Sequence, residues 1–466
     1  MRIRLLLCIV AAMSLWACSS GKGGKSDGDG ADSTLTARHP LPDTLRVATL
    51  YSPTSYFIYR DDEMGYDYAL VKSMANEKGL SIDLKIAPSL PEAIAMLDSG
   101  LVDVIAYEVP VTSEYKEKVI ACGPVNETTQ VLVQPKVKGE GHISDVTELV
   151  GREVYVEADS KYLQRMQNLD QELGGGINIH TVSKDTLITE DLIEMVSNGE
   201  IPLTVVDSDI ARINKTYYPD LDITMQVSFP QRSSWAVGKD SQWLADSINA
   251  WIKGEKPRQE NASLLKRYFE RSKNMPTAVT YNLDLSKGKV SPYDALFRKY
   301  AANVDYDWRL LAAQGFMESQ FNSDVVSWAG ARGIMQIMPR TATANGVSPD
   351  ELVDPETSIK VASKIVASLD KSFASRVPDK QERMKFIVAA YNSGPAHIYD
   401  AIELAKKTGR DPQRWVGNVE EALLLKSNPE YYNDPVCKYG YFRGRQTTEY
   451  VKNVMTLYDD IKKKIH

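Results

Sequence analysis

The spacing of apolar positions changes near residue 290 of this 466-residue chain. Before that point, short apolar runs of strand length alternate with stretches in which apolar residues recur at helical spacing. We expect strands at 45–50, 82–86, 102–106, 154–156, 203–207 and 234–237, and helices at 68–78, 90–99 and 243–253. Repeated strand-helix units predict an open sheet with helices on its faces, which binds ligands at the carboxyl ends of its strands.

These units should form two lobes. We expect the second lobe to begin near Val137 and the chain to return to the first lobe at the strand 234–237. A polar run punctuated by proline and glycine follows at 271–289, and such a composition is typical of a junction between domains.

After residue 290 nearly every apolar position falls at helical spacing. The expected helices are 292–303, 308–321, 340–345, 355–372, 381–393, 394–408, 415–425 and 447–464. The sequence therefore predicts a multidomain protein: an α/β two-lobed domain at 44–272, a linker at 273–290 and an all-α domain at 291–466.

The N-terminus has the pattern of an export signal. Arg2 and Arg4 precede an apolar run at 5–15 that is too short to remain as a membrane span. We expect the signal to be residues 1–17, followed by a flexible tether at 18–43 that is rich in Gly, Ser, Asp and Lys.

The residues Leu15-Trp16-Ala17-Cys18 resemble a bacterial lipobox. The resemblance implies that Cys18 is lipidated and that acyl chains hold the protein on a membrane, at the periplasmic face of the outer membrane of a Gram-negative bacterium. Ordinary signal-peptidase cleavage remains the alternative.

Charge and cysteine content narrow the class of protein. The net charge of −7 argues against nucleic acid as a partner. The five histidines are scattered, so we expect neither a metal site nor a cofactor. Of the four cysteines, Cys122 and Cys437 would remain as two isolated thiols after processing.

Glu318 is the leading catalytic candidate. It continues the apolar face of the helix expected at 308–321, for which Asp305 or Asp307 is the N-cap. Burial and the partial negative charge of a helix C-terminus both favour the protonated carboxyl that a general acid needs. Taken alone, a surface glutamate at a fraying helix end is the competing interpretation.

Three sequence blocks extend this signal: Glu318-Ser319, then Gly333-Ile334-Met335-Gln336-Ile337-Met338-Pro339, then Ala390-Tyr391-Asn392-Ser393-Gly394. In this order they resemble the soluble-lytic-transglycosylase catalytic domain, which has a goose-type lysozyme-like fold. The resemblance implies that Glu318 is the catalytic acid and base. It implies a substrate-binding role for Ser327, Gln336, Met338, Tyr391, Asn392 and Tyr450.

The N-terminal half resembles a family-3 periplasmic solute-binding domain, through Leu45–Leu50, Gly65–Tyr68, Ser99–Val104 and Thr112–Glu114. Asp207 matches the acidic residue that holds a ligand amino group in that family, although it can equally be a solvent-facing strand-end residue. Tyr115 stands where amino-acid-binding members carry the arginine that grips the ligand carboxylate.

Joined on one lipoprotein, the two domains resemble the membrane-bound lytic murein transglycosylase F family. This implies cleavage of peptidoglycan glycan strands with a 1,6-anhydro product. A binding lobe that shares one tether with a catalytic domain has little reason to capture solutes for a transporter, so we expect it to bind a muropeptide or peptide that regulates the enzyme. A spacer or localisation module is the alternative for this lobe. Two alternatives remain open. One is a hydrolytic muramidase that uses Asp324 as a second carboxylate, and the other is a binding receptor whose helical domain only adheres to glycan.

Overall fold

The computed structural model describes residues 43–136, 142–158, 160–183, 189–271 and 288–465, together with residues 283 and 285. The expected signal, the tether apart from Asp43, and much of the expected linker at 273–290 lie outside these residues. Within the described ranges no helix is long and apolar enough to cross a membrane.

Lobe 1 is a five-stranded sheet in the order β4-β1-β5-β12-β6. Strands β1, β4 and β5 are parallel, and β12 is antiparallel to both of its neighbours. The strands are β1 (Thr44–Thr49), β4 (Ser81–Ile86), β5 (Val104–Pro110), β6 (Val119–Thr128) and β12 (Gln231–Gly238). The helices are α1 (Tyr66–Lys78), α2 (Leu90–Asp98), α3 (Ser113–Lys118), α7 (Gln242–Ile252) and α8 (Glu255–Phe269).

Lobe 2 has its own five-stranded sheet in the order β11-β7-β10-β8-β9. Its strands are β7 (Gln130–Pro135), β8 (Glu153–Glu157), β9 (Asn178–Val182), β10 (Thr204–Asp207) and β11 (Leu221–Asp222). Its helices are the short 3-10 helix η1 (Val146–Leu149), then α4 (Lys161–Glu172), α5 (Thr189–Ser197) and α6 (Ser208–Lys215).

The expected start of lobe 2 near Val137 is wrong, because β7 already pairs with β10 and β11 in the second sheet. Strand β6 of lobe 1 runs into β7 with only Thr129 between them. The crossing between the lobes is therefore continuous extended chain, which carries no turn residues to mark the boundary. The predicted return to lobe 1 at 234–237 falls within β12, which begins at Gln231.

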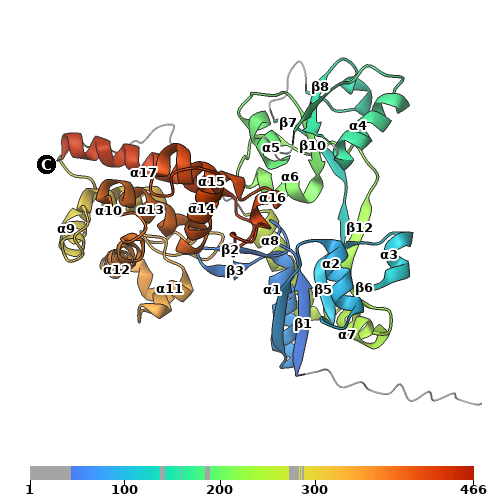
Figure 1. Ribbon diagram of the computed structural model, residues 1–466, viewed down its shortest axis with the longest axis horizontal. Coiled ribbons are helices and arrows are strands. Elements are labelled where there is room, and N and C mark those ends of the chain that lie inside the picture. Colours follow the sequence, from blue (N-terminus) through green and yellow to red (C-terminus); the bar gives the residue numbers. More distant parts are fainter. Residues whose placement is uncertain are drawn as a thin grey trace, which may run out of the picture. The chain divides into compact units, whose positions relative to one another are not determined.

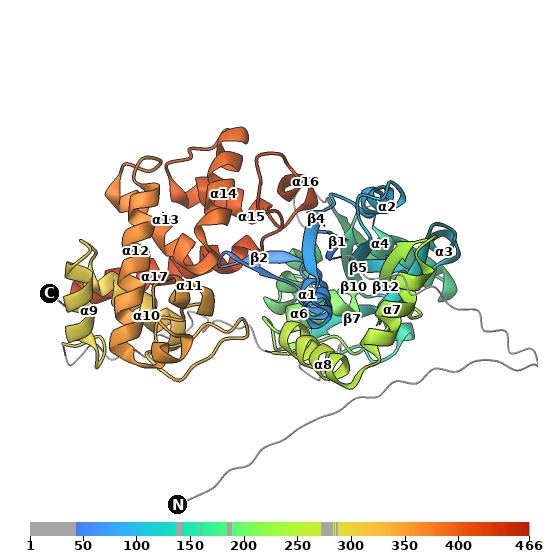
Figure 2. The same cartoon turned by 90° about the horizontal axis from the view of Figure 1, so that it is seen from below.

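A small hairpin projects from lobe 1 and is formed by β2 (Phe57–Tyr59) and β3 (Asp62–Met64). Its two turn residues, Arg60 and Asp61, have φ angles of 50° and 61°. Positive φ at both positions is the geometry of a type I′ turn, which fits the twist of antiparallel strands. Both views of the molecule place this hairpin against the C-terminal helices (Figures 1 and 2).

The C-terminal domain is helical, with α17 (Gly444–Lys464) packed against α10 (Trp308–Ser319), α13 (Lys380–Ser393) and α15 (Glu420–Leu425). The other helices are α9 (Asp294–Ala302), α11 (Pro339–Ala344), η4 (Pro349–Val353), α12 (Pro355–Phe373), α14 (Pro395–Lys407), η5 (Trp415–Val419) and α16 (Pro429–Tyr432). One apolar core joins them, and it includes Leu310, Leu311, Phe386 and Val454. Packing into this core fixes the position of α10, including its C-terminal turn.

Neither remaining thiol is paired within the described residues. Cys122 lies on β6 and Cys437 in the helical domain, and both are buried. Burial raises the pKa of Cys122 to about 12 and that of Cys437 to about 11, so both remain protonated, unreactive thiols.

Candidate functional site

Glu318 occupies the last turn of α10, and its side chain is only 3% exposed. Asp307 caps the helix by accepting a hydrogen bond from the backbone N–H of Arg309, and Gln320 ends it in the left-handed conformation. The Tyr450 hydroxyl of α17 donates to Glu318 Oε1 over 2.8 Å. Packing of α10 against α17 thus sets a phenol directly beside the carboxyl group.

The loop after Glu318 is held by its own polar side chains. Ser327 Oγ accepts a hydrogen bond from the N–H of Ala331 at 3.0 Å, and Ser327 remains partly exposed. The Gln336 amide donates to the carbonyl oxygens of Val325 and Gly333, each at 2.9 Å. Met338 is buried at the start of α11. These contacts shape the loop, and the expected glycan contacts of the three residues stay predictions.

Two further motif residues tie the blocks together. The Tyr391 hydroxyl donates to the Met335 carbonyl at 2.8 Å, and Asn392 Oδ1 accepts from the Thr447 hydroxyl at 2.7 Å. Burial, followed by the nearby Glu318 carboxylate, raises the pKa of Tyr391, so the phenol acts only as a hydrogen-bonding group. The structure brings Glu318, Gln336, Tyr391, Asn392 and Tyr450 into one cluster.

Arg60, at the tip of the lobe 1 hairpin, lies inside this cluster and was not expected from the sequence. Its Nη2 lies 3.0 Å from Glu318 Oε2 and 3.3 Å from Oε1. Its other donors reach backbone carbonyls of the helical domain: Nη1 to Gln336 at 2.6 Å, Nε to Asn392 at 3.0 Å, and the backbone N–H to Ser393 at 3.1 Å.

The Arg60–Glu318 pair is almost fully desolvated, with side-chain exposures of 10% and 3%. Burial alone would lower the pKa of Arg60, but the Glu318 carboxylate outweighs it and the pKa is raised, so Arg60 stays cationic. Both Glu318 oxygens accept hydrogen bonds in this arrangement.

A buried polar chain holds the strand before Arg60. His397 on α14 contacts the Ile58 carbonyl at 2.9 Å through Nε2 and Lys426 Nζ at 3.0 Å through Nδ1. Burial, followed by the Lys426 charge, lowers the pKa of His397 well below its usual value, so the ring is neutral. Its Nδ1 must then accept from Lys426, and its Nε2–H donates to the hairpin. Lys426 is paired in turn with Asp400 at 2.5 Å.

A glycine makes room for the hairpin tip. Gly394 is the last residue of the block Ala390–Gly394 and has a φ of 86°. A Cβ atom there would lie 2.6 Å from Asp61 Oδ1 and 2.8 Å from the Asp61 backbone nitrogen. Any side chain at this position would push the hairpin away. The block that carries Tyr391 and Asn392 thus also forms part of the surface that receives lobe 1.

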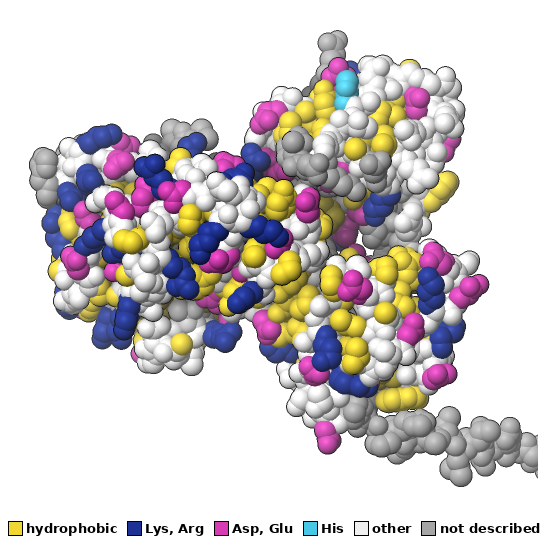
Figure 3. Space-filling view, in the orientation of Figure 1, with side chains coloured by type: hydrophobic (Ala, Val, Ile, Leu, Met, Phe, Trp, Pro, Cys, Tyr) yellow, Lys and Arg dark blue, Asp and Glu magenta, His cyan; other side chains and the backbone are white. Residues whose placement is uncertain are grey.

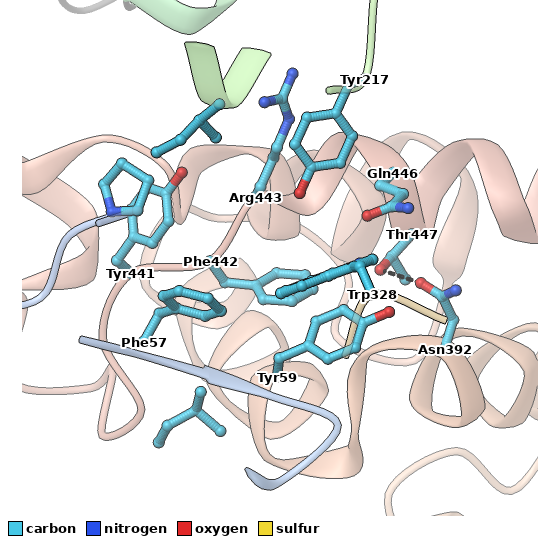
Figure 4. Close-up of a pocket in the computed structure, with 13 residues that line it drawn as sticks. Phe57, Tyr59, Tyr217, Trp328, Asn392, Tyr441, Phe442, Arg443, Gln446 and Thr447 are labelled. Carbon is cyan, nitrogen blue, oxygen red and sulfur yellow. Dashed lines mark hydrogen bonds between the residues drawn. The ribbon is translucent and has the colours of Figure 1, made fainter. Parts of the chain in front are cut away.

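An aromatic pocket of about 50 Å³ adjoins the cluster where the hairpin, α6 of lobe 2 and the helical domain meet. Phe57, Tyr59, Trp328 and Phe442 lie together in it, and the Asn392–Thr447 hydrogen bond closes one side (Figure 4). The Tyr59 and Trp328 rings are 5.3 Å apart. Aromatic contacts between the domains thus cover the approach to Asn392.

A larger cavity, of about 730 Å³, lies between the two lobes, where the space-filling view shows a hollow (Figure 3). Its charged lining residues are Glu108, Glu127, Lys161, Asp207 and Arg232. Lys161 pairs with Asp207, and Arg232 Nε pairs with Glu127 at 2.8 Å. Asp207 therefore lines the cavity as expected for a ligand-binding residue, and its role stays a prediction.

Tyr115 lies differently from Asp207. It packs against the apolar core of lobe 1, its ring is 5.6 Å from Lys118 Nζ, and it does not line the cavity between the lobes. The position at which an arginine would grip a carboxylate therefore supplies no ligand contact in this arrangement.

The alternative with two carboxylates depends on Asp324. This residue is exposed, and its backbone N–H donates to the Asn322 side chain. Within the described part of the chain no contact joins Asp324 to Glu318, and no group of His, Cys, Asp or Glu side chains there could hold a metal ion. The cluster around Glu318 thus contains a single carboxylate among the described residues.

Comparison with known proteins agrees with this division of the chain. Residues 45–271 match the family model of bacterial extracellular solute-binding proteins, family 3, and residues 295–413 match the transglycosylase SLT domain. Among solved structures, substrate-binding domain 2 of GlnP from Lactococcus lactis covers 50% of this chain and 98% of its own length, with 16% identity and a TM-score of 0.42. The two family models define a solute-binding domain followed by a transglycosylase SLT domain.

Full-length relatives carry both halves. A membrane-bound lytic murein transglycosylase F from Desulfosudis oleivorans is 32% identical over 426 residues, which is 90% of each chain. Another with that name, from Pseudomonas fluorescens, is 30% identical over 89% of this chain and 84% of its own. The chain belongs to the membrane-bound lytic murein transglycosylase F family and is a lytic transglycosylase.

Proposed function

We propose that the Glu318 cleft cleaves the β-1,4 bond between N-acetylmuramic acid and N-acetylglucosamine in peptidoglycan. The observation that supports this most directly is a buried carboxyl group at the end of α10, hydrogen-bonded to Tyr450 and without a carboxylate partner among the described residues. Glu318 protonates the leaving glycosidic oxygen, and the substrate N-acetyl group stabilises the positive charge at the anomeric carbon.

The same carboxylate then takes the proton of the C6 hydroxyl of the muramic acid, whose oxygen attacks the anomeric carbon. The bond to the leaving sugar is broken, a 1,6-anhydro ring is formed, and water takes no part. An attacking group within the same sugar ring has a high effective concentration, which favours this closure. In this scheme Tyr450 orients Glu318, Ser327 and Asn392 hold the N-acetyl group, and Gln336 and Met338 line the glycan groove.

Mass spectrometry of the muropeptides released by the purified protein tests the reaction type. We expect products that end in 1,6-anhydromuramic acid. Products with ordinary reducing ends would instead indicate hydrolysis, and intact glycan after prolonged incubation would indicate a binding protein.

The lipobox supports an anchor at the periplasmic face of the outer membrane, through lipid on Cys18. We expect Cys18→Ser to leave a soluble periplasmic protein or an uncleaved precursor, because the acyl chains would be lost. Cell fractionation followed by N-terminal sequencing measures both outcomes, with Cys122→Ser as a control that also removes one thiol. Processed Cys18→Ser protein that remains in the membrane fraction would show that another surface anchors the chain.

We also propose that the two-lobed domain regulates the cleft and that the structure represents the inhibited state. Arg60 engages both oxygens of the proposed catalytic carboxyl, and the hairpin fills the space in which a glycan would contact Gln336 and Asn392. A glycan strand and the docked hairpin are mutually exclusive in this cleft.

Both lobes contact the helical domain, so a ligand that binds between the lobes can affect the Glu318 cleft. Lobe 1 is held through Arg60 and Ile58, and lobe 2 through Arg445, whose Nε lies 2.6 Å from Glu194 Oε1. Arg443 adds a hydrogen bond of 2.7 Å to Asn214. A ligand that draws the lobes together changes their relative orientation, and both sets of contacts cannot then persist. Such a coupling is typically worth about 1–3 kcal/mol.

Stem peptides of peptidoglycan are the ligands we propose for this regulation. We expect a stem peptide to bind the protein and to raise the rate of glycan cleavage by roughly 5- to 150-fold. Asp207→Ala, which removes a cavity carboxylate, should weaken both effects together. Calorimetry combined with turnover assays measures them, with free amino acids as the comparison ligands. Tight binding of free amino acids without any change in turnover would contradict the proposal.

A further inference from the structure

Glu108 distinguishes the cavity between the lobes from a neutral peptide-binding site. It lies near the end of β5, where an open sheet binds its ligands. Three carboxylates and two basic side chains line the cavity, and the two ion pairs use Asp207, Lys161, Glu127 and Arg232. Glu108 has no hydrogen-bond or ion-pair partner within the described residues, so the lining carries one uncompensated acidic group.

The surroundings of Glu108 are also acidic. Asp207 from β10, Asp209 from the first turn of α6 and Asp67 from α1 all act on it, while Lys161 from α4 is the basic group that opposes them. Asp67 already accepts hydrogen bonds from Ser55 and from the Trp235 indole, each at 2.7 Å, and Lys161 is committed to Asp207. Glu108 is only partly exposed, and an acidic group in such surroundings favours the binding of a cation.

We propose that the cavity selects ligands that carry a primary ammonium group, and that Glu108 accepts the hydrogen bonds of that group. The inference deepens the proposed regulation, because it names the chemical class of the regulatory ligand. An ammonium group has three N–H donors, which can be shared between Glu108 and neighbouring oxygens. Tyr115, at the position of the usual carboxylate clamp, packs against the core of lobe 1 and does not line the cavity.

The proposal has a consequence for pH. Burial and then the neighbouring carboxylates raise the pKa of Glu108 well above its ordinary value, and an ammonium group beside it would favour the ionised carboxylate. Affinity for an amine ligand should therefore fall as the pH is lowered through that raised pKa. Calorimetry in buffers of different ionisation enthalpy should detect protons released on binding.

Matched peptides test the ligand class directly. The probes are L-Ala-γ-D-Glu-L-Lys, its norleucine analogue, and the N-acetylated form of each, titrated into the full chain purified in detergent. Replacing lysine by norleucine removes the side-chain ammonium group, and acetylation of the N-terminus removes the α-ammonium group. We expect removal of one particular ammonium to weaken binding at least about tenfold, the size typical of a charge-assisted hydrogen bond.

Two variants identify the acceptor. Glu108→Gln should bind the two members of the discriminating pair with nearly equal affinity and should lose the proton release. Glu127→Gln removes a carboxylate from the same cavity but from an existing, exposed ion pair, and should keep the discrimination. A circular-dichroism spectrum and a melting curve of each variant check that it is folded.

The proposal is overturned if wild type binds all four peptides equally or binds none, or if Glu108→Gln discriminates as wild type does. These readouts are independent of catalysis. Ammonium-selective binding with no effect on glycan cleavage would leave the ligand class standing and contradict only the regulatory role.

Discussion

Glu318→Gln should abolish cleavage of peptidoglycan while the helical domain remains folded. The amide is nearly isosteric and can still accept the Tyr450 hydrogen bond, but it can neither donate nor recover a proton as a carboxyl group does. One group serves both proton transfers in the proposed reaction, so the loss should exceed the roughly 10²- to 10⁴-fold typical of a single acid-base residue. Release of anhydromuropeptides, quantified by mass spectrometry, is the measurement.

A matched control is available on the same domain. Glu403→Gln removes an exposed carboxylate that pairs with Lys406, and it should leave the rate unchanged. Because Glu318→Gln leaves the Arg60 cation buried without its partner, its melting temperature should fall even though its far-ultraviolet circular dichroism is retained. Activity within about tenfold of wild type would remove Glu318 from its assigned role.

The helical domain is the part of the fold that could be predicted most closely from the sequence. The helix expected at 355–372 is α12, Pro355–Phe373, and that expected at 381–393 is α13, Lys380–Ser393. Both begin at an aspartate whose side chain accepts backbone N–H hydrogen bonds, Asp354 and Asp379. Local caps and helical periodicity fix these boundaries, so a single sequence carries the information.

The lobe boundary shows where local patterns stop being informative. Strands β6 and β7 belong to different sheets although only one residue separates them. An extended segment has the same local pattern whichever sheet it joins. The sheet that each strand joins is decided by its partner strand, which is β12 for β6 and β10 for β7. Both partner strands lie far away in the sequence.

The hairpin that contacts Glu318 could not be predicted for a related reason. Hairpins with two-residue turns are usually signalled by Asn-Gly or Asp-Gly, whereas this turn is Arg60-Asp61. The ion pair of Arg60 with Glu318 joins residues 258 positions apart. Glu108 was missed as well, because the two ion pairs beside it, Lys161 with Asp207 and Arg232 with Glu127, are visible only in the three-dimensional arrangement.

Arg60→Met should activate the enzyme in the absence of any ligand. Methionine keeps a long unbranched side chain and bears a similar cost at the left-handed φ of 50°, but it removes the ion pair with Glu318 and the hydrogen bonds to Gln336 and Asn392. A coupling of about 1–3 kcal/mol between docking and activity corresponds to a rise of roughly 5- to 150-fold in basal turnover. The further stimulation by a regulatory peptide should shrink by the same factor. The reason is that the ligand and the mutation both shift the equilibrium between the docked and the undocked hairpin.

Arg46→Met is the matched control, since Arg46 also belongs to lobe 1 and pairs with a carboxylate, Asp103, but within its own lobe. It should leave basal turnover unchanged. The double variant Arg60→Met with Glu318→Gln should be inactive, which would show that the gained activity arises in the Glu318 cleft. A slower Arg60→Met enzyme would mean that Arg60 contributes to substrate binding or catalysis. Unchanged turnover would mean that the contacts of Arg60 do not hold the hairpin in the cleft. A slower enzyme would therefore contradict the proposal that Arg60 inhibits the cleft.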